Sequence, residues 1–363
     1  MQGFPRHITL ELYQYTIRLL LGHDPAEADS SILATCTILC VYEMMASSVS
    51  EWRRHLKGCA GLLRMRKWNG NSEGIVKACF WAFARIDVWA AFFLNQTTLI
   101  PTDSWVDEES LVLVAEKGDT DDYCNLAILI FAKIINVLNE EDGAGVTSLA
   151  EPREKAQASW EELQRWRRWR PRSVKPLLRV DKSEKNPFPT IVFALSASIC
   201  GNTFYHAGSI LLLQSGLVRP DPSLDLSPVW HARELGGIST SNPSHANWVN
   251  HLQPLYIAGR VFGGSSKQPL AIQPGHRSCS VHVSQRPRHL RQTDPGSTGS
   301  ERFGASTSSV VDRVEDWNSP SESEDFAAEK IALLKHLAKI ERETGWKTSE
   351  RAKDLRMLWG LEN

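Results

Sequence analysis

The sequence predicts an all-α fold, a multi-helix bundle or superhelical array interrupted by a long disordered insert. Apolar residues recur at three- and four-residue spacing through the first two thirds of the chain, which is the periodicity of amphipathic helices. Strand signals are weak, because no Asn-Gly or Asp-Gly turn lies between two alternating apolar runs, and we expect no hairpin. The composition changes after Phe262, where the helical spacing stops.

The overall composition is that of an ordinary globular protein. Of 363 residues, 42% are hydrophobic and 23% are charged, and the formal net charge of −1 gives no reason to expect a polyanionic partner. The seven cysteines include no CxxC pair, and most lie in apolar helical patterns, which indicates free thiols in a reducing compartment. Charges break the apolar N-terminal segment, which we interpret neither as a signal peptide nor as a membrane span, so we expect an intracellular protein.

Two helices are expected on either side of residue 50. Residues 28–47 repeat apolar side chains at helical spacing, and Ser50 is a suitable N-cap for the next helix because Glu51 follows in the first turn. The second helix carries one mixed face, which consists of Trp52, His55, Leu56, Cys59, Leu62 and Leu63. The polar and glycine-rich segment 69–74 ends it.

The helix expected over 75–95 is apolar nearly all round, which is typical of a central helix covered by its neighbours. Only Lys77, Arg85 and Asp87 interrupt it with charge. The same spacing predicts further helices, over 123–139, 151–170, 189–214 and 326–341 and a last one from Thr348 or Ser349 through Trp359.

The stretch from Gly263 to about Glu324 is rich in Ser, Gly, Pro, Gln, Arg and His. Such a composition cannot bury enough apolar surface to offset the entropy lost on ordering, so we expect disorder. The predicted organisation is a helical domain over 1–262, a disordered insert over 263–325 and a closing helix pair over 326–360 that packs on the first segment.

Signatures of metal binding and catalysis are missing from the sequence. His55 and Cys59 lie four residues apart on one helix, as half of a zinc site would, but no second pair follows at a suitable spacing. A lone His or Cys on an apolar face is usually a core residue, and the same holds for Cys36 and Cys40. No GxSxG, HExxH, GxxxxGK[ST] or GxGxxG motif occurs in a suitable context, so we expect neither an enzyme nor a bound cofactor.

Arg85 and Asp87 are the charges that stand out, because they lie inside the most apolar helix. At a separation of two residues they point to different sides, so each is expected to reach another helix. The alternative is a ligand pocket, since perturbed buried charges cluster at functional sites. His55, Arg85 and Asp87 are therefore the candidates for an effector site or an inter-helix polar cluster.

The run RWRRWRPR at 165–172 has two interpretations. Arginine and tryptophan together could bind nucleic acid, arginine through its charge and tryptophan by stacking on bases. The favoured interpretation is structural. One helical face is expected to consist of Trp160, Leu163, Trp166 (or Arg167) and Trp169, and arginines complement the dipole before Pro171. The basic stretch 275–292 is equally open to interpretation as a solvated tether or a phosphate binder.

Five segments of the sequence carry recognisable motifs. Segment 34–63 has an apolar helix ending in Tyr-Glu and then W-R-x-H-x-x-G, and segment 79–105 has F-W-x-x-x-R-x-D followed by W-x-A, which includes Arg85 and Asp87. The others are WEELQRWRRWRP (160–171), the segment 230–262, and 333–360, which contains I-E-x-E-T-G-W. In their order and number these segments resemble the regulatory region of fungal zinc-cluster transcription factors.

The resemblance implies a nuclear regulator of transcription by RNA polymerase II. In this family the helical region is taken to modulate activation through effectors, the transcription machinery, or contact within a homo- or heterodimer, and no membrane is involved. The family's DNA reader is a module of six cysteines holding two zinc ions, and nothing in this sequence matches it. We therefore expect zinc only in a missing N-terminal module, and no sequence-specific DNA binding by this chain alone.

A second departure from the family is the length of the insert. Relatives pass to the closing helices through a short loop, whereas some sixty residues intervene here, and part of 271–314 reads like translated non-coding sequence. A gene-model error is our hypothesis, and transcript sequencing that shows uninterrupted coding would remove it. Two other classes stay open, a protein–protein scaffold and a small-molecule-binding protein or enzyme with a pocket near Arg85 and Asp87.

Overall fold

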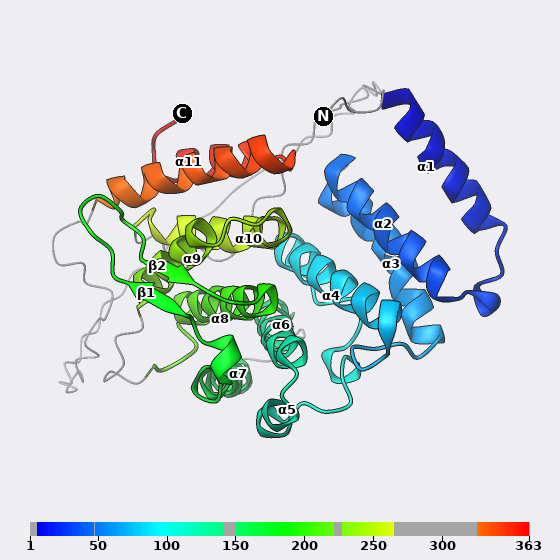
Figure 1. The fold of residues 1–363 in the computed structure, drawn as a ribbon, viewed down its shortest axis with the longest axis horizontal. Helices are drawn as coiled ribbons and strands as arrows, with labels where there is room; N and C mark the ends of the chain where they lie inside the picture. Colours follow the sequence, from blue (N-terminus) through cyan, green and yellow to red (C-terminus); the bar gives the residue numbers. More distant parts are fainter. Residues whose placement is uncertain (1–5, 47, 141–149, 221–226, 265–324, 363) are drawn as a thin grey trace, which may run out of the picture. The chain divides into compact units, whose positions relative to one another are not determined.

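The computed structural model describes residues 6–46, 48–140, 150–220, 227–264 and 325–362, and it confirms the all-α prediction (Figure 1). The predicted insert lies almost wholly outside these residues. The α-helices of the described ranges are α1 (Arg6–Leu21), α2 (Ser30–Ala46), α3 (Val49–Met65), α4 (Gly74–Leu94), α5 (Leu111–Lys117), α6 (Thr120–Asn139), α7 (Ala150–Arg168), α8 (Ser196–Ser215), α9 (Pro228–Ser241), α10 (His245–Val261), α11 (Ala327–Thr344) and α12 (Ser349–Leu358). Short 3-10 turns lie at Pro25–Glu27, Thr102–Ser104 and Arg172–Val174.

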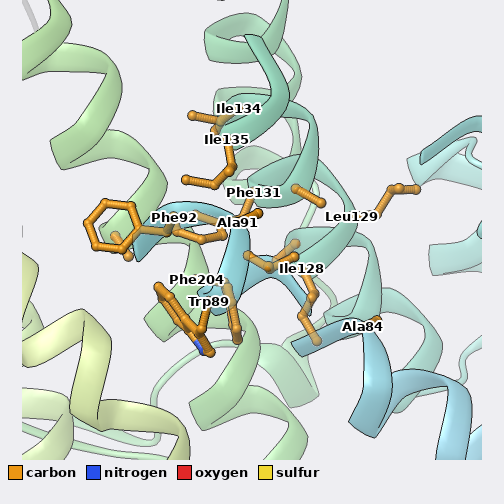
Figure 2. Close-up of a cluster of buried hydrophobic side chains, with 14 of the residues drawn as sticks. Ala84, Trp89, Ala91, Phe92, Ile128, Leu129, Phe131, Ile134, Ile135 and Phe204 are labelled. Carbon is orange, nitrogen blue, oxygen red and sulfur yellow. The ribbon is translucent and has the colours of Figure 1, made fainter. Parts of the chain in front are cut away.

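The centre of the core is formed by α4, α6 and α8, which are the helices with the most buried side chains. The ring of Trp89 from α4 stacks on Phe204 from α8 with 5.4 Å between centroids, and Phe131 from α6 lies 5.1 Å and 5.3 Å from these two rings (Figure 2). Offset aromatic contacts of this kind add to the free energy of simple burial. The sequence pattern that predicted a covered central helix thus describes α4 correctly.

Helices α2 and α3 pack on each other and on α4. The start of α3 differs from the prediction, because Ser48 and not Ser50 is its N-cap. The backbone N–H of Ser48 donates to the Glu51 carboxylate over 2.9 Å, which satisfies a backbone donor at the helix start. Ser50 lies inside the first turn of the helix.

A small antiparallel sheet precedes α8, in the region where a continuous helix from 189 was predicted. Strand β1 (Leu178–Val180) pairs with β2 (Thr190–Val192), with Arg179 opposite Ile191. Helix α8 therefore begins only at Ser196, and the expectation of no hairpin was wrong. The reason is tertiary, because β2 packs on α9, and Gly237 of α9 allows the carbonyl of Pro189 to approach.

The closing helices α11 and α12 contact α10, and α11 also contacts α9 (Figure 1). A side chain at Gly259 of α10 would lie 2.7 Å from Leu355 of α12, so this glycine permits the close packing. The Arg233 guanidinium of α9 lies 2.8 Å from the Glu329 carboxylate of α11, and the Trp359 indole donates to the Gly259 carbonyl over 3.0 Å. Apolar burial and polar contacts thus attach segment 325–362 to the helices before the insert.

Candidate functional site

Asp87 lies on the face of α4 that points to the turn after that helix. The turn starts at Asn95, whose left-handed conformation (φ 50°) ends α4 and sends the chain back over it. The backbone N–H of Leu99 donates to the Asp87 Oδ2 over 2.6 Å, while Oδ1 has no hydrogen-bond partner among the described residues. Complete burial raises the pKa of Asp87 to about 6, and the backbone N–H groups of Leu99 and Ile100 and the charge of Arg53 oppose this rise.

Arg53 of α3 reaches the same turn from the other side. Its side chain is 5% exposed, and its Nη2 donates to the Thr97 carbonyl over 2.6 Å. Its Nε and Nη1 have no partner in the part of the chain that the structure describes, and burial lowers the pKa of the guanidinium. Arg53 and Asp87 thus act on each other electrostatically without a direct hydrogen bond, and both hold the turn 95–100.

Arg85 does not share this site. It is half-buried, and its charge acts on the Cys200 thiol of α8, where it opposes the rise in pKa that burial causes. Arg85 therefore faces α8 and Asp87 faces the turn that α3 covers, although only one residue separates them in the sequence.

His55 lies in a third place. Its side chain is 43% exposed, and its Nε2 lies 3.5 Å from the Glu43 carboxylate of α2, which also accepts a hydrogen bond from Tyr13. A surface hollow of about 480 Å³ is lined by Glu43, Glu51, Arg54 and His55. The three candidate residues therefore do not converge on one pocket, and Arg53 is the residue that joins Asp87 instead.

The spacing of His55 and Cys59 does not make a shared site either. The Cys59 thiol is 3% exposed and lies 3.6 Å from the Cys40 thiol of α2, whereas His55 is 43% exposed and lies beside Glu43. Across the described ranges, no group of three or more His, Cys, Asp or Glu side chains is arranged to hold a metal ion. Nor does any helix of these ranges have the length and apolarity to cross a membrane.

The basic aromatic run 165–172 is partly tied into the fold. Trp169 is 42% exposed, so the prediction that it shares the inner face with Trp166 was wrong. Trp166 is fully buried and donates to the Tyr123 carbonyl over 3.0 Å, while the Tyr123 hydroxyl donates to the Trp166 carbonyl over 2.7 Å. The Arg167 guanidinium lies over the ring of Trp230 at 5.4 Å, and Arg170 donates to Asn202. Two arginines and one tryptophan of this run are therefore engaged in packing.

Buried histidines between α8, α9, α10 and α11 were missed at the level of sequence. Nδ1 of His206 lies 2.9 Å from Nδ1 of His231, and both rings are buried. In a second network, the Ser239 hydroxyl lies 3.0 Å from His251 Nδ1 and 2.8 Å from His336 Nε2. Burial lowers the pKa of His231 and His251 to about 3 and that of His336 to about 4, so these rings are neutral. No spacing in the sequence signals these pairs, because each partner comes from a different helix.

Comparisons with known proteins give one consistent result. The model of the fungal specific transcription factor domain matches residues 6–269. The transcription activator AMTR1 of Alternaria alternata is 25% identical over 314 residues, which covers 67% of this chain and 40% of that protein. This chain thus spans less than half the length of that relative, and no solved structure matches it. The match extends from α1 to the end of α10, and the chain belongs to the family of fungal-specific transcription factor domains, which are regulators of transcription.

Proposed function

We propose that this chain is the region of a fungal transcription factor that modulates activation by RNA polymerase II in the nucleus. The observation that carries the proposal is the family match over residues 6–269. The transcription activator of Alternaria alternata that aligns with the chain supports the same role. Effectors, the transcription machinery or a second factor would act on the helical array, and DNA would be reached only through a zinc-cluster module of the same protein or of a partner.

The junction of α3, α4 and the turn 95–100 is where we expect regulation to act. Within the described ranges, Arg53 and Asp87 leave buried polar atoms without hydrogen-bond partners, and an unsatisfied buried group costs about 1–3 kcal/mol. An arrangement that satisfied these atoms would gain this free energy. A ligand or coregulator that binds such an arrangement better would shift the population toward it.

Tethering tests the regulatory role directly. The chain is fused to an unrelated DNA-binding domain and expressed with a matching reporter gene in a filamentous fungus. We expect reporter transcription to change relative to the DNA-binding domain alone. The control fusion carries Leu211→Asp, which places a charge at a side chain that is 1% exposed and destroys the fold. Equal reporter output from all three proteins at equal abundance would contradict the proposal.

A DNA-binding assay on the isolated chain tests the proposal that DNA is reached only through a zinc-cluster module. We expect only weak binding to any duplex, which disappears as salt rises because it rests on phosphate contacts alone. Fluorescence anisotropy with several unrelated duplexes measures this. A single duplex bound far more tightly than the others at physiological salt would contradict the expectation.

The scaffold alternative has one specific observation in its favour. From residue 8 to its end, helix α1 has no fully buried side chain, and Leu12, Leu19 and Leu21 are 61%, 58% and 81% exposed. Exposed apolar side chains of this kind favour a protein partner. The alternative of a small-molecule pocket near Arg85 and Asp87 has less support, since the two side chains face different elements. Purification from nuclei and identification of the bound proteins separates the two classes.

A further inference from the structure

Three thiols gather where α2 packs on α3. Cys36 and Cys40 lie one turn apart on α2, and the Cys59 thiol of α3 lies 3.6 Å from that of Cys40. Cys36 is also a neighbour of Cys59, because the two thiols share a hydrogen bond. All three are free thiols. Cys59 is therefore positioned between two possible disulfide partners.

The three thiols differ in access and in acidity. Cys40 and Cys59 are 2% and 3% exposed, whereas Cys36 is half-buried and is the thiol that a small solute reaches. The hydrogen bond from Cys59 lowers the pKa of the Cys36 thiol to about 7. The same contacts, with burial, raise the pKa of Cys59. The hydrogen bond thus favours the thiolate of Cys36, the form that acts as a nucleophile, while Cys59 keeps its proton.

We propose that this thiol cluster is a site of oxidation by hydroperoxides, at which Cys36 reacts first and a Cys40–Cys59 disulfide between α2 and α3 is the final product. The geometry supplies an accessible first thiol, a central thiol next to it, and a buried third thiol that completes the bond. The role of such a cross-link in transcription would rest on the regulatory function proposed above, whereas the chemistry does not depend on it.

The reaction proceeds in three balanced steps. The Cys36 thiolate attacks the terminal oxygen of ROOH, the O–O bond breaks, and ROH leaves after protonation, so that sulfur is oxidised to sulfenic acid and peroxide is reduced. The Cys59 sulfur then attacks the Cys36 sulfur, and the hydroxyl leaves as water with the Cys59 proton. Finally the Cys40 sulfur attacks Cys59, which forms the Cys40–Cys59 bond and returns Cys36 as a thiol that takes up the Cys40 proton. The sum is two thiols and one hydroperoxide giving one disulfide, one alcohol and one water.

Little movement is needed for the last bond. A disulfide requires about 2.05 Å between sulfurs, so the Cys40 and Cys59 thiols at 3.6 Å must approach by about 1.5 Å. Helix packing already places both on facing surfaces of α2 and α3. A change of side-chain rotamers covers such a distance without unfolding either helix.

A second pair of cysteines in the same chain provides an internal comparison. Cys124 of α6 and Cys200 of α8 influence each other electrostatically, but burial raises the pKa of both thiols. They lack the lowered pKa of Cys36 and are expected to stay reduced under the same treatment.

The test uses the full chain with Cys279→Ser, since Cys279 lies outside the described residues. The protein is exposed to hydrogen peroxide at pH 7, and free and oxidised cysteines are alkylated in sequence and located by peptide mass spectrometry. We expect a Cys40–Cys59 disulfide with Cys36, Cys124 and Cys200 free. Cys36→Ser should slow this disulfide at least about tenfold, because the accessible thiolate is lost. Cys59→Ser should leave a sulfenic acid at Cys36 that dimedone traps, and Cys200→Ser should behave as the parent does.

Two results would overturn the proposal. One is a disulfide that forms at the parent rate in Cys36→Ser, and the other is oxidation of Cys200 as fast as Cys36. Circular dichroism at 222 nm verifies that each variant is folded. None of these readouts depends on transcription.

Discussion

At the scale of the residue, Asp87 shows how burial acts against a charge. Its carboxylate has one short backbone hydrogen bond and a cation nearby, yet burial outweighs both and raises its pKa to about 6. The folded state therefore binds a proton more tightly than the unfolded chain does. Proton binding by Asp87 therefore stabilises the folded state. This stabilisation is fully present below pH 3.8, the pKa of Asp87 in the unfolded chain, and is lost as the pH rises through about 6, its pKa in the folded protein.

The variant Asp87→Asn should remove this dependence on pH. We compare the free energy of unfolding of the parent with that of the variant at each pH. The parent's value relative to the variant's should fall by about 2–3 kcal/mol as the pH rises from 4 to 7. Urea unfolding at a series of pH values measures both proteins, and the subtraction cancels all other titrating groups. A difference that stays constant with pH would show that Asp87 has an ordinary pKa.

Two glycines should respond to alanine with opposite sign. At Gly237 a methyl group would lie 2.3 Å from the Pro189 carbonyl oxygen, which is backbone and cannot rotate away. Gly237→Ala should therefore lower the free energy of unfolding by about 2–3 kcal/mol. At Gly58, inside α3, no atom lies within 4 Å of the added carbon, so Gly58→Ala should raise it by about 0.5–1 kcal/mol.

Urea midpoints of the two variants and the parent give the comparison, with circular dichroism as the signal. Stabilisation by Gly237→Ala would mean that β2 does not press on α9 as described. Destabilisation by Gly58→Ala would mean that this surface of α3 has a neighbour in the folded protein.

At the scale of the element, the interface of α8, α9, α10 and α11 should make the protein sensitive to acid. The lowered pKa of each buried histidine means that the unfolded chain takes up a proton that the folded chain rejects. The stability that depends on these neutral rings is present above pH 6.5 and is lost as the pH falls toward 4. Each histidine contributes a slope of about 1.4 kcal/mol per pH unit in this window.

His336→Gln should reduce that slope. Glutamine can still form a hydrogen bond with the Ser239 hydroxyl, which lies 2.8 Å from His336 Nε2, but it takes up no proton. Both proteins lose free energy of unfolding as the pH falls from 6 to 5, and the variant should lose about 1.4 kcal/mol less than the parent. Equal slopes in His336→Gln and the parent would contradict the burial of His336.

The sequence predicted correctly those helices whose boundaries follow from the spacing of their own apolar residues. The helices predicted over 28–47 and 75–95 are α2 and α4 within a few residues, because their apolar patterns continue over several turns. The hairpin of β1 and β2 could not be predicted, since strands of three residues leave no pattern and are held by α9. The predicted helix from 189 was wrong for this reason.

The same distinction applies to the residues of the candidate site. Asp87 could be singled out because a charge inside an apolar helix is visible in the sequence. Arg53 could not, because it lies beside Trp52 and Arg54 and only the packing of α3 shows which arginine points inward. The partner of Cys59 is Cys40 on another helix and not His55 on its own, a choice that spacing along one helix leaves undetermined.

At the scale of the whole molecule, the two segments of the chain on either side of residues 265–324 share one apolar interior. One continuous cluster contains buried side chains from α2 to α10 and from α11 and α12, and a small separate cluster consists of Ile191, Phe193, Ile199 and Ile238. The Arg351 guanidinium of α12 lies 3.9 Å from the ring centroid of Phe93 in α4, which adds a contact between distant parts of the sequence. A continuous core predicts that the described helices unfold together.

Leu355→Ala tests this cooperativity from the end of the chain. Leu355 is fully buried against Gly259, so its truncation should lower the free energy of unfolding by about 2–5 kcal/mol. If the core is one unit, the slowest-exchanging amides of α4 and α6 should lose the same protection as those of α12. Hydrogen exchange with mass spectrometry resolves these helices, and Met357→Ala, at a side chain that is 46% exposed, should change protection by less than about 0.5 kcal/mol. Faster exchange confined to α11 and α12 would instead mean that the closing helices open alone, and that the apolar face of α10 becomes available to a partner without unfolding of the rest.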